Sequence, residues 1–107
     1  MTLVDAAFHF GYEYISTENK IITVRLKDGR LESFEFIQSF EFNSDRKRMS
    51  VVLRHNGLLK LYVKGSDTTV IPRLAKTQPF LKYINDKASE MSKTGLRSLL
   101  FAMRILP

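Results

Sequence analysis

The sequence predicts an α+β fold in which a twisted antiparallel β-sheet is flanked by helices. Three observations lead to this class. Several short apolar runs are separated by turns, as in antiparallel strands. One of these turns, Asn56-Gly57, is a strong hairpin signal. Apolar residues also recur at helical spacing near both ends of the chain. The predicted order is a helix, four or five strands, two helices and a final strand, and 107 residues suit a single domain.

The first predicted element is a short helix over residues 2–10. Leu3, Ala7 and Phe10 share one helical face, and Val4 and Phe8 share another. Gly11 follows directly, where a glycine commonly ends a helix.

Strands are predicted over residues 20–26 and 31–42, with a turn at Lys27-Asp28-Gly29 between them. The second strand carries four phenylalanines at even positions. Because side chains alternate along a strand, all four are expected to point to one face. They are Phe34, Phe36, Phe40 and Phe42.

Residues 49–54 and 58–64 form the predicted hairpin, because Asn56-Gly57 suits a two-residue type I′ turn. This register sets Met49 opposite Lys64 and Val51 opposite Tyr62. The residues that alternate with these pairs are more apolar and should face the core. Lys64 is therefore expected on the opposite face of the hairpin. That core-facing set comprises Ser50, Val52, Arg54, Leu59, Leu61 and Val63.

In the basic run Arg46-Lys47-Arg48 before this hairpin, the lysine is expected on a different face of the sheet from the two arginines. If the strand continues back through the run, Lys47 lies on the face of Lys64. Arg46 and Arg48 then point to the opposite side, where they are expected to be solvated or paired with Asp45.

Two helices and a strand complete the prediction. Ser66 or Asp67 can cap a short helix through residues 68–76, which Pro72 should kink or end early. A second helix covers residues 79–95, with Phe80, Ile84, Ala88 and Met91 on one face; Pro79 marks its start and Gly95 follows its end. The last strand is expected over residues 96–106.

Composition narrows the classes of function. The formal net charge of +6 favours anionic partners. The absence of cysteine excludes a disulfide framework and a thiolate metal site, and His9 and His55 are interpreted as structural or solvated. The apolar tail contains Arg97 and Arg104 and is too short to span a bilayer, and the first ten residues do not resemble a signal peptide.

One arrangement of residues indicates a binding slot. Two lysines on one face, Phe42 just upstream and Gly65 nearby describe a slot for an aromatic ring attached to phosphates. The alternative is that Phe42 belongs to the core and Lys64 is an ordinary edge lysine. The sequence contains no Walker motif, no Gly-x-Gly-x-x-Gly loop and no nucleophile elbow.

The stretches "FEFNSDRKRMSVVLRHNGLLKLYVKGSD" and "GLRSLLFAMRIL" resemble the nucleotide-binding domain of P-type ATPases, specifically the phospholipid-flippase branch. "TLVDAAFHFGYEY" is similar to the opening helix and strand of that domain, so the resemblance covers nearly the whole chain. Asp67 stands where the ion-pumping branches typically have proline, which favours the lipid branch.

The resemblance implies an ATP-binding role for five residues. Phe42 would stack on adenine, Ser44 would lie beside the nucleotide, and Lys47 would reach its ribose or phosphate side. Lys64 would line the bottom of the pocket, and Arg97, at the start of the last strand, would face the phosphates or ribose.

The resemblance also implies a parent pump on whose cytosolic side this domain holds ATP. The γ-phosphate would pass to an aspartate in another domain, with Mg²⁺ bound elsewhere in the parent. The partners implied are the phosphorylation and actuator domains, and a phospholipid substrate of the parent alone. We therefore expect residues 1–107 to be a single nucleotide-binding domain excised from a larger membrane protein. As an isolated, soluble monomer it should bind ATP weakly and hydrolyse none.

Three departures accompany the resemblance. Ser66 replaces the usual alanine. An acidic pocket residue of the family would precede Met1. The Asp-Lys-Thr-Gly phosphorylation motif, the later magnesium-binding aspartates and the transmembrane helices of the family do not occur in this sequence.

Two other classes of function remain as alternatives. A nucleic-acid-binding module would use the basic, aromatic-rich surface and prefer polymers to free ATP. No RNA-binding signature is present, so no nucleic-acid partner is expected. A peripheral membrane or scaffold domain would bind acidic lipid independently of ATP.

Overall fold

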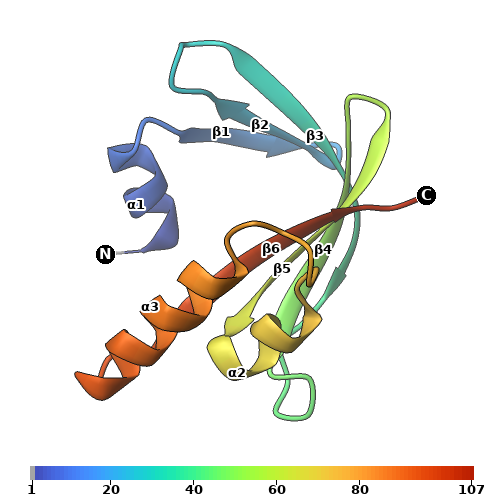
Figure 1. Cartoon of the computed structure of the whole chain (residues 1–107). Helices are drawn as coiled ribbons and strands as arrows, with labels where there is room; N and C mark the ends of the chain where they lie inside the picture. Colours follow the sequence, from blue (N-terminus) through green and yellow to red (C-terminus); the bar gives the residue numbers. More distant parts are fainter. Residues whose placement is uncertain (1) are drawn as a thin grey trace.

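The fold is a six-stranded antiparallel sheet in the order β1-β2-β3-β4-β5-β6, seen in a computed structural model that describes residues 2–107 (Figure 1). The predicted α+β class with a twisted sheet and flanking helices is therefore confirmed. Each strand pairs with its neighbours in sequence, so β1 and β6 form the two edges. The elements in chain order are α1 (Leu3–His9), β1 (Glu13–Glu18), β2 (Ile21–Arg25), β3 (Leu31–Phe40), β4 (Arg48–His55), β5 (Leu58–Ser66), α2 (Asp67–Val70), the 3₁₀ turn η1 (Ile71–Arg73), α3 (Leu81–Lys93) and β6 (Leu99–Ile105).

Helix α1 begins and ends with well-formed caps. The Thr2 hydroxyl accepts from the Asp5 amide, and the Asp5 carboxylate accepts from the Thr2 amide, which makes a capping box. At the other end Gly11 has a φ of 96° and Tyr12 donates to the Ala7 carbonyl at 2.9 Å. These bonds satisfy carbonyls of the last turn, as the predicted glycine stop requires.

Strand β1 was indicated by the family resemblance but not by the pattern of apolar residues. It joins β2 through Asn19 and Lys20, both of which have positive φ. This turn contains no glycine or proline, so the signals that marked the other turns do not reveal it.

Strand β3 differs from its prediction in two ways. It ends at Phe40, which leaves Phe42 outside the sheet. Its pairing with β4 also shifts between Phe36, opposite Leu53, and Gln38, opposite Val52. A bulge of this kind inserts one residue and reverses the alternation beyond it. The expectation that all four phenylalanines share a face is therefore wrong: Phe34 and Phe36 lie on one face and Phe40 on the other.

The β4–β5 hairpin has the predicted register along its whole length, from Arg48 opposite Gly65 to His55 opposite Leu58. Asn56 and Gly57 have φ values of 53° and 77°, as a type I′ turn demands. We call the face that carries Met49 and Lys64 the front face, and the face that carries Ser50 and Val63 the back face.

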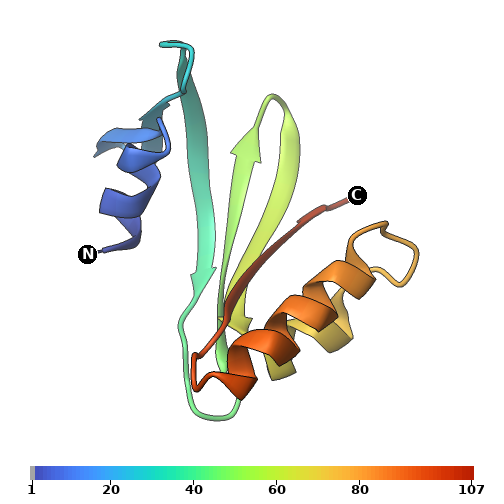
Figure 2. The same ribbon diagram turned by 60° about the vertical axis from the view of Figure 1, so that its left-hand side comes forward.

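Helix α2 packs on β5 and β6 at the back face, and α3 lies beside α2 (Figure 2). Helix α2 ends at Val70, and Pro72 lies in the 3₁₀ turn that follows, which confirms the predicted early end. Val70 is 1% exposed and Ala88 of α3 is 8% exposed. Gly95 ends α3, and Leu96 still donates to the Met91 carbonyl at 2.9 Å. Consequently β6 begins at Leu99, three residues later than predicted.

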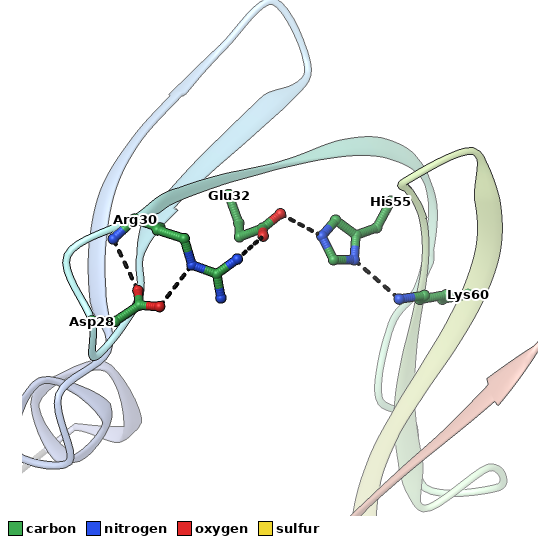
Figure 3. A network of polar contacts seen from close by, with 5 residues as sticks. All are labelled: Asp28, Arg30, Glu32, His55 and Lys60. Atoms are coloured by element: carbon green, nitrogen blue, oxygen red, sulfur yellow. Dashed lines mark hydrogen bonds and ion pairs between the residues drawn. The ribbon is translucent and has the colours of Figure 1, made fainter.

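His55 is structural, in agreement with its interpretation, whereas His9 is exposed. Figure 3 shows His55 in a polar network that joins three strands. Its Nε2 lies 2.8 Å from Glu32 Oε2, and Lys60 Nζ lies 3.0 Å from its Nδ1. An ammonium group has only donors, so Nδ1 accepts and Nε2 carries the proton that is donated to Glu32.

No helix within residues 2–107 combines the length and the apolar character that a bilayer crossing requires.

Candidate functional site

A cavity of about 490 Å³ opens on the front face at the end of the hairpin away from its turn. It brings together three of the five predicted site residues, namely Phe42, Lys47 and Lys64. The other lining residues are Met49, Gly65, Ser66 and Leu99.

Strand pairing positions the inner part of this cavity. Met49 of β4 lies opposite Lys64 of β5, and Leu99 of β6 lies opposite Ser66. Opposite residues share a face, so these four side chains belong to the front face. The cavity therefore has an apolar wall from Met49 and Leu99 beside the ammonium group of Lys64.

The loop of residues 41–47 supplies the outer part of the cavity, and Asn43 organises it. The Asn43 side-chain oxygen accepts from the amides of Asp45 and Arg46, at 2.9 and 2.7 Å. Its carbonyl accepts from the Lys47 amide at 2.8 Å. These three bonds fold the loop into a compact turn between Phe42 and Lys47.

Arg46 anchors the loop to the sheet, which corrects its prediction as a solvated or Asp45-paired residue. Its guanidinium donates to the carbonyls of Phe40, Glu41 and Arg48 and to Ser50 Oγ, each at 3.1 Å. The same group lies 5.7 Å from the centre of the Phe40 ring. These bonds satisfy carbonyl oxygens around the end of β3 and the start of β4, whereas an exposed ion pair with Asp45 would contribute little stability.

Lys47 lies at the cavity, although not for the reason predicted. Strand β4 begins at Arg48 and does not continue back through the basic run. Lys47 instead has a φ of 56°, a left-handed conformation at the end of the Asn43 turn. Arg48 does lie on the opposite side, where it pairs with Gly65 and donates to the Arg46 carbonyl at 2.9 Å.

Phe42 is 64% exposed, so it is not a member of the core. Its position after the end of β3 frees its ring from the sheet. An exposed aromatic ring beside a cationic cavity can stack on a planar ring.

Ser44 and Arg97 are exposed and do not line the cavity. Ser44 lies in the turn of the 41–47 loop, and Arg97 precedes β6 rather than opening it. The structure therefore leaves their predicted contacts untested.

Gly65 is required by packing behind the cavity. A Cβ built on Gly65 would lie 3.0 Å from Arg48 Cβ, 3.1 Å from the Lys47 carbonyl oxygen and 3.3 Å from Val70 Cγ2. These contacts lie on the back face, so the absent side chain admits helix α2.

The lining of the cavity combines two lysines with apolar side chains and has no carboxylate. This arrangement suits a planar ring that carries an anionic group, because the ring can stack while the ammonium groups attract the charge. It does not suit a metal ion, which prefers carboxylate oxygens. Within residues 2–107 no three acidic or histidine side chains are grouped as metal ligands.

Sequence reasoning missed Met49, Leu99, Asn43 and Arg46 as contributors to the site. Met49 follows from the hairpin register, which sets it opposite Lys64. Leu99 depends on the pairing of β5 with β6, across two intervening helices, for which the sequence gives no local signal. Asn43 carries the side chain most typical of a turn, and this signal was available.

Comparison with known proteins identifies the family of this chain. The family described as "P-type ATPase, cytoplasmic domain N" matches residues 18–107. A phospholipid-transporting ATPase of Schizosaccharomyces pombe is 41% identical over 106 residues, which is 98% of this chain and 8% of that protein. Phospholipid-transporting ATPase ID of Homo sapiens is 39% identical over 106 residues, 97% of this chain and 9% of that protein. A phospholipid-transporting ATPase of Saccharomyces cerevisiae is 36% identical over 109 residues, 95% of this chain and 8% of that protein. The chain thus spans less than a tenth of the length of these relatives.

Proposed function

Because this chain belongs to the family of P-type ATPase cytoplasmic N domains, we propose that it binds ATP in the cavity of the front face. Phe42 stacks on the adenine, and Lys47 and Lys64 attract the anionic part of the nucleotide. The observation that carries the proposal is the convergence of these three side chains on one cavity of about 490 Å³. Ser44 and Arg97 are proposed to contact the nucleotide from the rim, after movement of their exposed segments.

The proposed contacts give weak binding. A stacked base contributes about 1–3 kcal/mol. Two accessible lysines contribute about 0–1 kcal/mol each, because water and salt screen exposed charges. The sum is close to the roughly 4 kcal/mol of a complex with a millimolar Kd. We therefore expect high-micromolar to millimolar affinity for ATP.

The proposal extends to the role of the domain in a longer protein. We propose that residues 1–107 form one nucleotide-binding unit of a phospholipid-transporting pump, on the cytosolic side of its membrane. The unit holds ATP, and an aspartate in the phosphorylation domain of the pump receives the phosphoryl group. The actuator domain is the other proposed partner within the pump. Mg²⁺ would accompany the phosphates and be bound by them and by residues outside this cavity, since the lining offers no carboxylate. Which phospholipid is moved is determined outside this domain.

Titration of the chain with ATP tests the proposal. In a spectrum of backbone amides, ATP should shift the signals of Phe42, Lys47, Lys64 and Ser66 with a common Kd. Phe42→Ala should raise that Kd about fivefold or more, because it removes the stacking surface. Lys64→Ala should raise it by a smaller factor, about two- to fivefold, because the contact is partly screened.

Matched controls locate the effect at the cavity. Phe10→Ala removes an aromatic ring that is 74% exposed on another part of the molecule and should leave the Kd unchanged. Lys82→Ala removes a lysine of α3 and should do the same. If ATP at saturation shifts none of the cavity amides, or if single-stranded polynucleotide displaces it at equal nucleotide concentration with higher affinity, the proposal is wrong.

A further inference from the structure

A second cavity, of about 670 Å³, lies on the back face of the sheet. The sheet lies between it and the front cavity, because its lining residues on β4 and β5 alternate with Met49 and Lys64. Four arginines line it, namely Arg46, Arg48, Arg73 and Arg104. Arg46 and Arg48 belong to one basic run, whereas Arg73 lies in η1 and Arg104 in β6, so the fold gathers three distant segments of the chain.

The floor of this back cavity is apolar. Leu61, Val63 and Ala102 project from β5 and β6, and Val70 of α2 closes the floor with 1% exposure. A cationic rim above an apolar floor differs from an ordinary basic surface, which attracts anions without a place for an apolar group.

The positive charges of this rim are not neutralised by the chain. Within residues 2–107 none of the four arginines forms an ion pair, whereas Arg25, Arg30 and Arg54 each pair with a carboxylate. Loss of solvent, followed by the nearby charges of Arg73 and Arg46, lowers the pKa of Arg48. The repulsion among these guanidinium groups would be relieved by an anion bound between them.

Hydrogen bonds hold Arg48 and Arg73 of the rim in place without using all of their donors. Arg48 Nη1 donates to the Arg46 carbonyl at 2.9 Å, and Arg73 Nη1 donates to the Thr69 carbonyl at 2.7 Å. The Nε and Nη2 groups of both side chains have no protein partner within residues 2–107. Arg46 differs, because its bonds to the 41–47 loop occupy it.

We propose that the back cavity binds an organic phosphate monoester that carries a short apolar body. Planar guanidinium groups bind the oxygens of a phosphate in pairs, and several of them match its multiple oxygens and double charge. The apolar body lies on the floor formed by Leu61, Val63 and Val70. The same chemistry is offered by a soluble alkyl phosphate and by the terminal phosphate of a lipid such as phosphatidic acid.

Calorimetric titration of the 107-residue chain with hexyl phosphate, inorganic phosphate and hexanol tests both halves of this chemistry. Hexyl phosphate should bind at least about tenfold more tightly than inorganic phosphate, because only the ester buries an apolar chain. Hexanol should show no measurable binding. Amides of Leu61, Val70 and Ala102 should shift, and that of Leu99, which lines the front cavity, should not.

Arginine variants assign the site. Arg73→Gln and Arg104→Gln should each weaken hexyl phosphate binding about fivefold or more, since each removes a charged donor. Arg54→Gln removes the same charge from a neighbouring position of the sheet, where Glu35 pairs with it, and should change binding less than twofold. Lys64→Ala should leave hexyl phosphate binding intact, which separates this site from the proposed ATP site.

Vesicles that contain phosphatidic acid distinguish the two sources. If the protein co-sediments with these vesicles, and if Arg73→Gln weakens this binding while Arg54→Gln does not, the ligand is a lipid. If the protein binds hexyl phosphate but not the vesicles, the ligand is a soluble ester. Both results support the proposal. Equal affinity for hexyl and inorganic phosphate overturns it. Equal effects of Arg73→Gln and Arg54→Gln, in variants whose amide spectra show a retained fold, overturn it as well.

Discussion

Gly65 lines the front cavity and packs closely against Val70 of the back-face helix α2. An added methyl group would press on Arg48 Cβ, the Lys47 carbonyl oxygen and Val70 Cγ2, at 3.0 to 3.3 Å. We expect Gly65→Ala to lower the free energy of unfolding by about 1–3 kcal/mol, the usual cost of overpacking. Because the methyl group lies on the back face, the ATP affinity of the folded variant should change little.

Urea unfolding of the variant, together with ATP titration, measures both effects. Ser33→Ala is the control, since it changes an exposed strand residue outside the front cavity without adding a buried methyl group. A loss of ATP binding in folded Gly65→Ala, with wild-type stability, would show that Gly65 serves the nucleotide instead of helix α2.

Arg46 is expected to act as a positioning residue for the proposed ATP site. It does not line the front cavity, yet its four hydrogen bonds fix the loop that carries Phe42 and Lys47. Arg46→Lys retains the charge but cannot make the same set of bonds with one ammonium group. We expect unfolding stability to fall by about 1–3 kcal/mol and the Kd for ATP to rise about threefold.

A structural role alone would leave the affinity of the folded protein unchanged, so the ATP titration separates the two effects. Arg25→Lys is a suitable control, because Arg25 forms an exposed ion pair with Glu13 far from the loop. Wild-type ATP affinity in Arg46→Lys would contradict the positioning role.

At the scale of elements, His55 joins β3 to the β4–β5 hairpin. Its ring stacks on Phe34 with centroids 4.2 Å apart and connects Glu32 to Lys60 (Figure 3). His55→Gln removes the stacking and at least one of the hydrogen bonds. We expect unfolding stability to fall by about 1–2 kcal/mol.

A double-mutant cycle with Glu32→Gln measures how much of this loss comes from the hydrogen bond. We expect a coupling of at least about 0.5 kcal/mol, because the two side chains are partly buried and in contact. The exposed pair Lys82 and Asp86, at i,i+4 on α3, should show smaller coupling in the same assay. Additive effects of His55→Gln and Glu32→Gln would indicate that the network does not stabilise the sheet.

Elements whose limits are set by turn residues in the local sequence were predictable. The hairpin register follows from Asn56-Gly57 alone, and this register brings Met49 and Lys64 to one face. The bulge at Ile37 was not predictable, because nothing in the alternation of Phe34, Phe36 and Phe40 marks an inserted residue. The pairing of β5 with β6 was not predictable either, because it joins segments that are distant in the sequence. The anchoring of the loop by Arg46 depends on the carbonyl groups near the end of β3, and the sequence does not show where that strand ends.

At the scale of the whole molecule, the sheet is open and its core is thin. The accessible surface is 8299 Å², above the roughly 6,100 Å² that the size scaling gives for a compact protein of 12.4 kDa. The radius of gyration is 15.3 Å, against about 13 Å for a compact chain of this length. Among residues 2–107, Val70 and Ala88 are the only buried hydrophobic residues.

Part of the apolar surface left open forms a continuous row on the edge strand β6. Its front-face residues are each about half exposed, namely Leu99, Phe101, Met103 and Ile105, at 49, 63, 52 and 51%. An edge strand with an apolar face and one free backbone edge is a template for association with another chain. The net charge of +6 opposes this association through mutual repulsion.

We therefore expect the isolated chain to be monomeric when dilute and to associate reversibly as protein concentration rises. Salt should strengthen the association, because it screens the charge and leaves the apolar attraction intact. Phe101→Lys adds a charge at the centre of the apolar face and should keep the chain monomeric at every salt concentration. Phe10→Lys, at a residue 74% exposed on the end of α1, adds the same charge elsewhere and should suppress association much less. Sedimentation velocity over a concentration series, at low salt and at about 0.5 M salt, measures all three proteins. Equal suppression by the two variants would assign the effect to net charge, and the edge of β6 would then have no part in it.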